Sequence, residues 1–134
     1  MQYKTITYYR FKKLQNLEEL RGYFKGLCES LDLLVRILIG KEGVNAGVSG
    51  KKENVEKFKK VLEKTREFSK MTYREQKVKE NSYHKLVVRI RKEIVSFGKK
   101  VDMSKRARHV SPKTFKKWMD SKEEILVLDV RNDY

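Results

Sequence analysis

Hydrophobic and polar positions alternate with a period of two in several short segments. In Tyr3–Tyr9, Ile6 and Tyr8 alternate with Thr5 and Thr7, which is the pattern of a strand with one face in a core. The same alternation, or a run of β-branched apolar residues, recurs in Leu33–Ile39, Val44–Ser49 and Leu86–Ile90. These four segments are the predicted strands, and Met71–Val78 is a candidate for a further partner strand.

Two longer segments repeat their apolar residues at helical spacing instead. The first begins after Asn16, a residue type whose side chain can cap a helix. Its apolar stripe consists of Leu17, Leu20, Phe24, Leu27, Cys28 and Leu31. The second carries Val55, Phe58, Val61 and Leu62 on one face, and its other face is mostly charged. Both segments are therefore predicted to be amphipathic helices lying on a sheet.

The order of these elements, β-α-β-β-α-β, predicts an α+β fold. A turn over Gly40–Gly43 joins two of the strands into a hairpin, and both helices are expected on one face of an antiparallel sheet. That is the ferredoxin-like, acylphosphatase-like sandwich. The sequence shows no phosphate-cradling glycine loop with a following arginine, so acylphosphatase chemistry is not supported.

After Phe97 the chain becomes basic and poor in large apolar residues. We expect residues 1–98 to form the ferredoxin-like domain and residues 99–122 a basic linker with a short helix, capped by Ser111 and begun by Pro112. Residues 123–134 are expected to supply the opening strand of a second domain, because Ile125–Val130 is almost continuously apolar. The alternative is that this strand joins the edge of the first sheet.

The net charge says more about possible partners than the hydrophobic content does. Among 134 residues, 33 are Lys or Arg and 18 are Asp or Glu, which gives a formal charge of +15. Such a surplus favours an anionic partner, with nucleic acid ahead of an anionic membrane surface. The alternative is a lysine-rich surface that is merely solvated.

Cysteine usage and hydropathy indicate a cytoplasmic protein. A single cysteine cannot form an internal disulfide, which favours a reducing compartment. No apolar run approaches the roughly 20 residues needed to cross a bilayer, and the amino terminus lacks the apolar core of a secretory signal. No membrane association is therefore expected.

The chain offers no catalytic constellation and no metal motif. Cys28 lies on the apolar stripe of its helix, next to Glu29, so it is expected to be a core residue rather than a nucleophile. His84 and His109 are far apart and have no ligand partners at metal-binding spacing. We therefore expect no catalytic residue, no metal and no cofactor within this chain.

A basic run is the strongest functional signal. Between Leu86 and Lys117 there are eleven lysines and arginines but only two acids. Phosphate binding needs many cations along one path, and the nearby Tyr83 could stack on unpaired bases. The predicted RNA-binding residues are Lys85, Arg89, Arg91, Lys92, Lys105, Arg106 and Arg108. The alternative is a solvated linker beside an exposed strand face.

The predicted hairpin contains the most specific pair of polar residues in the chain, Glu42 and Asn45, with Gly43 between them. One interpretation is a site at the rim of the sheet, where glycines permit close backbone approach. The other is turn chemistry, with glycine at positive φ and Asn45 bonding locally to the backbone. From the residues alone, the second interpretation is favoured.

Three stretches together resemble the bacterial rhodanese-type tRNA uridine hydroxylases. Val35–Gly50, VRILIGKEGVNAGVSG, is similar to their G-R-I-L-x-A-x-E-G-I-N-G-T-x-S-G signature. His84–Gly98, HKLVVRIRKEIVSFG, is similar to their L-K-V-R-x-R-K-E-I-V segment. Val127–Tyr134, VLDVRNDY, resembles the strand that opens their rhodanese domain. The order and spacing agree over essentially the whole chain.

The resemblance implies a two-domain protein that uses molecular oxygen to hydroxylate carbon 5 of the wobble uridine in certain tRNAs. It implies tRNA and a carboxy-terminal rhodanese domain as partners. It also implies that the required cysteine lies beyond Tyr134, so that this chain alone is inactive. In this motif Asp129 and Arg131 fall at positions that are usually structural.

The sequence departs from the family signature at three positions. Val35 and Ala46 replace glycines, and Gly47 replaces a threonine, which removes any substrate contact that the threonine hydroxyl makes in relatives. The motif also leads us to expect that Glu42 and Asn45 support an interface with RNA or with the second domain. Two functions remain open: the tRNA-recognising part of a hydroxylase, or a stand-alone RNA-binding or interaction module without catalysis.

Overall fold

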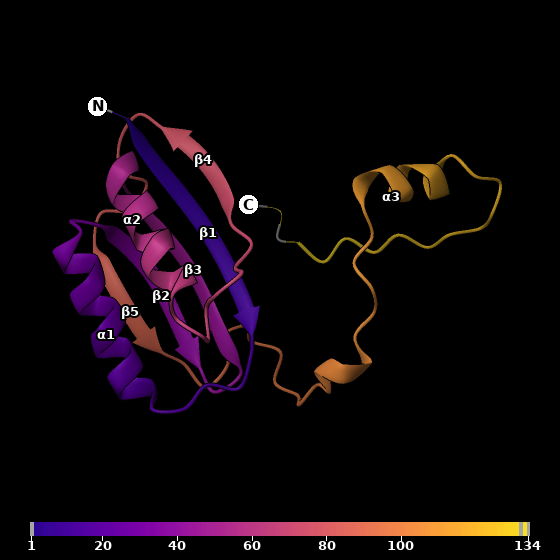
Figure 1. The fold of residues 1–134 in the computed structure, drawn as a ribbon. Helices are drawn as coiled ribbons and strands as arrows, with labels where there is room; N and C mark the ends of the chain where they lie inside the picture. Colours follow the sequence, from indigo (N-terminus) through magenta and orange to yellow (C-terminus); the bar gives the residue numbers. More distant parts are fainter. Residues whose placement is uncertain (1, 132, 134) are drawn as a thin grey trace. The chain divides into compact units, whose positions relative to one another are not determined.

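The computed structural model describes residues 2–131 and 133 of the chain (Figure 1). The chain divides into two compact units, with the boundary between Gly98 and Lys99. The boundary coincides with the shift in composition after Phe97, and each unit is described by itself.

The first unit is built on a five-stranded sheet. Its strands are β1 (Tyr3–Phe11), β2 (Leu34–Gly40), β3 (Gly43–Lys51), β4 (Arg74–Val78) and β5 (Leu86–Ile90), in the order β4-β1-β3-β2-β5. Neighbouring strands are antiparallel except β2 and β5, which are parallel. The long central strands, β1 and β3, pair from Tyr3 opposite Lys51 to Phe11 opposite Gly43.

Two helices cover one face of this sheet (Figure 1). Helix α1 (Leu17–Ser30) packs on β2 and β5, and α2 (Lys52–Glu63) packs on β1 and β3. The core between the layers contains the alternate apolar residues of the strands and the helical stripes, for example Ile6, Ile37, Val48, Phe24 and Phe58, all fully buried. The period-two and helical patterns therefore meet at one apolar layer, as expected of an α+β sandwich.

The predicted fold class is confirmed, with one correction to its topology. The last strand of the ferredoxin-like unit is β4, which pairs antiparallel with β1, whereas the sequence interpretation gave that place to Leu86–Ile90. That segment is an added fifth strand, β5, parallel to β2 at the opposite edge, so the sheet is mixed rather than antiparallel. The period-two pattern predicts which side chains of a strand are buried, but it does not predict which strand pairs with it.

The start of α1 corrects a second expectation. Asn16 precedes the helix as predicted, but its side chain makes no capping hydrogen bond. Instead Asn16 has a left-handed backbone with φ 52°, and its carbonyl accepts from the Leu20 N–H at 3.0 Å. Asparagine is one of the few residues that tolerate this region, so its contribution is to the turn rather than to the cap.

The second unit contains a short 3₁₀ helix (Met103–Lys105) and α3 (Pro112–Met119). Helix α3 begins as predicted, with Pro112 in its first turn and the Ser111 hydroxyl accepting from the Thr114 N–H at 3.1 Å. The predicted strand Ile125–Val130 is not formed, either in this unit or at the edge of the first sheet. A strand needs a hydrogen-bonded neighbour, and the described residues supply none.

None of the helices in the described residues combines the length and the hydrophobicity that a bilayer crossing requires.

Candidate nucleic-acid interface

The hairpin between β2 and β3 is fixed from several sides by the rest of the first unit. The Glu42 carboxylate accepts a hydrogen bond from the Ile94 N–H at 2.6 Å. The Glu42 carbonyl accepts from the Lys12 N–H at 2.9 Å, and the Lys41 carbonyl from the Leu14 N–H at 3.0 Å. The hairpin therefore holds the segment after β1 and the segment after β5, and the Glu42 side chain has a structural partner.

Gly43 is required by close packing of the backbone. Its φ is 149°, and a Cβ at this position would lie 1.9 Å from the carbonyl oxygen of Arg10. Any side chain here would push β1 away from β3 at their last pair. The turn-chemistry interpretation therefore explains Gly43. It does not explain Asn45, whose side chain is exposed on the sheet face away from the helices.

That face of the sheet is not covered by a helix of the first unit (Figure 1). Strand pairing places its residues in two neighbouring rows. One row runs through Arg74, Thr7, Gly47, Arg36 and Val87, and the next through Tyr9, Asn45, Leu38 and Arg89. We call the residues of these two rows, with Phe11, the open face.

The connection between β4 and β5 closes one end of the open face. The Ser49 hydroxyl accepts from the Thr5 hydroxyl at 2.9 Å and from the Ser82 N–H at 2.9 Å. Tyr83 packs over Gly47 so closely that a Cβ at Gly47 would lie 1.8 Å from the Tyr83 hydroxyl oxygen. The half-buried Tyr83 thus fills the space that a threonine at position 47 would need, which gives a steric reason for this departure from the family signature.

Four of the predicted RNA-binding residues belong to the first unit, and all four are exposed: Lys85, Arg89, Arg91 and Lys92. Arg89 lies on the open face, opposite Leu38. Arg91 follows β5 and continues its pairing, since its N–H donates to the Ile39 carbonyl at 2.8 Å. Strand alternation thus turns these arginines away from Leu86 and Val88, which pack against the core.

The other three, Lys105, Arg106 and Arg108, lie in the second unit and are also exposed. Lys105 ends the 3₁₀ helix, whose start is fixed by the Asp102 carboxylate accepting from the Ser104 N–H at 3.0 Å. A continuous cationic path across the two units remains a prediction.

Cys28 has the properties of a core residue, as predicted. It is fully buried in the core among apolar side chains. Burial raises the pKa of its thiol to about 12, and the nearby charge of Glu29 acts in the same direction. A thiol that stays protonated and inaccessible does not act as a nucleophile.

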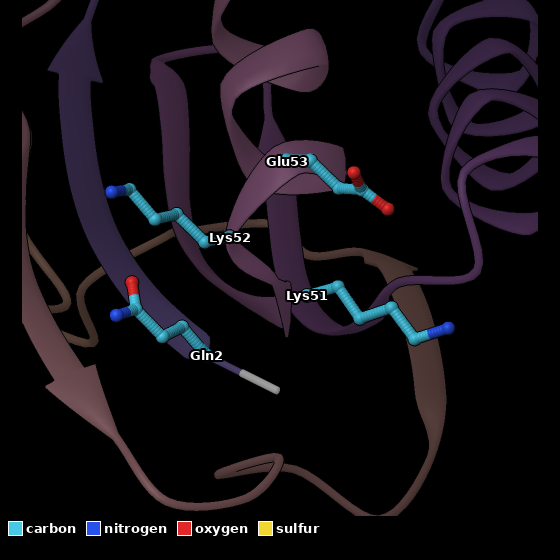
Figure 2. A pocket seen from close by; sticks show the side chains of 4 residues that line it. All are labelled: Gln2, Lys51, Lys52 and Glu53. Carbon is cyan, nitrogen blue, oxygen red and sulfur yellow. The ribbon is translucent and has the colours of Figure 1, made fainter.

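The described residues contain no cluster of three histidine, cysteine or acidic side chains able to hold a metal ion. A shallow hollow lies where β3 runs into α2, lined by Gln2, Lys51, Lys52 and Glu53. Figure 2 shows that these side chains spread apart rather than converge, and the Lys52 N–H is already bonded to the Gln2 carbonyl at 2.9 Å.

Sequence reasoning missed the exposed residues Tyr9, Phe11 and Arg36 of the open face. Tyr9 and Phe11 are 56% and 37% exposed. The signal was present, because both residues continue the alternation of Thr5 and Thr7 on the side opposite Ile6 and Tyr8. That they lie on the same face as Arg36 and Arg89 follows only from strand order.

Comparison with known proteins agrees with the resemblance read from the sequence. The family model described as the UPF0176 acylphosphatase like domain matches residues 3–94. The tRNA uridine(34) hydroxylase of Chlamydia pneumoniae is 34% identical over 98% of this chain and 40% of that protein. The protein of the same name from Wolbachia pipientis (strain wPip) is 31% identical over 100% of this chain and 48% of that protein.

The chain thus spans less than half the length of these relatives. Among solved structures, BlrP1 BLUF superimposes with a TM-score of 0.55 and 13% identity, covering 67% of this chain and 64% of that chain, a likeness of fold alone. The match of the family model to most of the first unit identifies the chain: it belongs to the UPF0176 acylphosphatase-like domain family.

Proposed function

We propose that this chain is the amino-terminal, tRNA-recognising part of an oxygen-dependent tRNA wobble-uridine 5-hydroxylase of the rhodanese type. The observation that carries the proposal is similarity over the whole chain to proteins named tRNA uridine(34) hydroxylase. Hydroxylation, with molecular oxygen as co-substrate and a cysteine in a rhodanese domain, is proposed for a protein of the relatives' length. The role proposed for this stretch is to bind tRNA in the cytoplasm.

The exposed basic residues support this role. Lys85, Arg89, Arg91, Lys92, Lys105, Arg106 and Arg108 are exposed, and none forms an ion pair with a carboxylate of the described residues. Cations without an acidic partner are free to neutralise phosphates and release counterions. A merely solvated surface would carry the same residues, so binding has to be measured.

The test is a fluorescence-anisotropy titration of tRNA with the 134-residue chain across a series of salt concentrations. Two variants remove predicted phosphate-binding side chains: Arg89→Ala/Arg91→Ala in the first unit and Lys105→Ala/Arg106→Ala/Arg108→Ala in the second. The control, Arg21→Ala/Lys25→Ala, removes two exposed cations of α1. For every cation that neutralises a phosphate, its removal should make the slope of log affinity against log salt shallower by about 0.7 to 0.9.

Equal losses of affinity in the control and in the two test variants would mean that binding is an unspecific effect of net charge. Absence of tRNA binding by the wild-type chain at low salt would overturn the proposal. In that case the stand-alone interaction module becomes the better description.

A further inference from the structure

We propose that the open face binds unpaired RNA nucleotides, with a base stacked on Tyr9, helped by Phe11, and phosphates held by Arg36, Arg74 and Arg89. This inference rests on the proposed function, because it specifies which part of a tRNA the first unit recognises. It adds a base-contacting surface to the cationic run and predicts a preference for single strands.

Two aromatic side chains of β1 provide a surface on which a base can stack. Tyr9 and Phe11 lie two residues apart on β1, so both project from the same side of the strand. Their ring centroids are 6.2 Å apart and the rings are inclined at 69°, an edge-to-face arrangement in which the two rings are not stacked on each other. Tyr9 is more than half exposed, and its ring is available to a planar ligand.

Three arginines give the open face its positive charge. Arg74 lies opposite Thr7, Arg36 opposite Gly47 and Arg89 opposite Leu38. All three arginines are exposed, and none is paired with a carboxylate of the described residues. Cations therefore border the aromatic residues on both sides, toward β4 and toward β5.

The distribution of acids makes this charge one-sided. Within the five described strands the only acidic residue is Glu75. Its carboxylate points to the helix-covered side, where it is paired with Lys4 at 2.5 Å and with Lys59. The open face thus has no strand carboxylate to repel a polyanion, although the opposite side of the same sheet contains one.

The combination fits single-stranded RNA better than a duplex. Unpaired bases can be stacked on aromatic side chains and read at their edges, whereas bases within an RNA helix are shielded by its geometry. Stacking platforms flanked by cations are the usual means of binding single strands. Asn45, exposed between Tyr9 and Leu38, offers both a donor and an acceptor to a base edge.

The β4–β5 connection limits where the strand can lie. Tyr83 covers Gly47, and Ser82 closes over Thr5 and Ser49. The row containing Tyr9, Asn45, Leu38 and Arg89 is the part of the face away from this closure. The RNA is therefore expected to cross the sheet along that row, with Tyr83 at its border.

The test compares binding of a fluorescein-labelled oligouridylate and of an RNA duplex of equal length, each titrated at the same series of salt concentrations. Tyr9→Ala should weaken oligouridylate binding roughly 5- to 160-fold, the loss expected for one stacked base, without changing the salt slope. Tyr9→Phe keeps the ring and should restore most of the affinity. The matched control is Tyr23→Ala, which removes a similarly exposed ring (43%) from α1 and should change nothing.

Arg36→Ala should instead make the salt slope shallower by about 0.7, as expected for a phosphate bound by a single cation on a single strand. Thermal melts monitored by circular dichroism verify that each variant is folded. A folded Tyr9→Ala variant with wild-type affinity, or a wild-type preference for the duplex, would overturn the inference.

The two proposals fail differently. If tRNA still binds and Lys105→Ala/Arg106→Ala/Arg108→Ala still weakens it while Tyr9→Ala has no effect, tRNA recognition stands and base stacking on the open face is wrong. If the wild-type chain binds neither tRNA nor oligouridylate, both proposals fail.

Discussion

The two units of this chain contain similar apolar patterns with opposite outcomes. In β2, the alternate residues Val35, Ile37 and Ile39 are essentially inaccessible to solvent. In Ile125–Val130 the residues are just as apolar, yet Leu126 is 95% exposed and Leu128 79%. The first segment is a strand between two neighbours, and the second has no assigned secondary structure.

An apolar run indicates a segment that is stabilised by burial. Whether its side chains are buried depends on the elements that pack against it. Strand β2 is buried because β3 and β5 satisfy its backbone hydrogen bonds and helix α1 packs on its side chains. Helix α3 shows the intermediate case. It forms from local signals, its cap and its proline, while Phe115 and Trp118 stay 43% and 46% exposed.

The largest expected difference between the two units is in the effect of truncating one apolar side chain in each. Ile37→Ala should lower the free energy of unfolding by about 2 to 5 kcal/mol, because it leaves a cavity in a packed core. Leu128→Ala should change it by less than about 0.5 kcal/mol, since that side chain is already in water. Urea denaturation followed by circular dichroism measures both values. Comparable losses in the two variants would show that residues 125–130 are packed in solution.

A second prediction compares a carboxylate from each unit. Glu42→Ala should lower the free energy of unfolding by about 1 to 3 kcal/mol, because the N–H of the buried Ile94 loses its partner. Asp129→Ala removes the exposed pairing with Arg131 and should leave the unfolding midpoint where it is. The sequence-based expectation that Glu42 supports an interface predicts instead that Glu42→Ala lowers function while the melting temperature stays almost unchanged. An unchanged midpoint for Glu42→Ala would restore the interface role.

The smallest effect concerns the charged cluster at the β4 edge of the first unit, which sequence patterns did not indicate. Hydrogen bonds from Lys4 lower the pKa of the Glu56 carboxyl, and those from Lys4 and Lys59 lower that of Glu75. These carboxylates in turn raise the pKa of Lys4 above 10.5. The contribution of the cluster is therefore complete between the ordinary carboxyl and lysine values.

That contribution should disappear as the pH falls through the lowered carboxyl values and, at the other end, as it rises through the raised value of Lys4. Lys4→Met should cost about 1 kcal/mol or less near neutral pH, because the carboxylates are about one-third exposed and screened by solvent. Urea midpoints between about pH 3 and neutrality compare the two proteins. A difference that persists unchanged at the acidic end would assign the loss to packing of the lysine stem instead.

Much of the fold was predictable because burial in this protein is periodic. The segments Tyr3–Tyr9, Leu33–Ile39 and Leu86–Ile90 lie within or nearly on observed strands. Both amphipathic helices were found where their apolar stripes recur, with Cys28 inside the core. The boundary after Phe97 was visible as a change in composition. Each of these features depends on residues that are close together in the sequence.

Long-range pairing was not predictable in the same way. Alternation shows that Leu86, Val88 and Ile90 face a core, but it does not show that β5 joins β2 in parallel while β4 joins β1. Nor does it show that Glu42 reaches Ile94 or that Tyr83 rests on Gly47. Contacts of this kind depend on which edges remain free once the central strands have paired.

The α+β class, the periodic elements, the excess of positive charge and the family resemblance follow from the amino-acid sequence, because these are local or compositional properties. That Tyr9, Asn45, Leu38 and Arg89 form one row follows only from the folded sheet. The physical reason is that the four residues come from four strands, and a row across a sheet exists only after strand order and register are fixed. The run Ile125–Val130 is the opposite case. It is apolar, but it has no hydrogen-bonded neighbour among the described residues and does not form a strand.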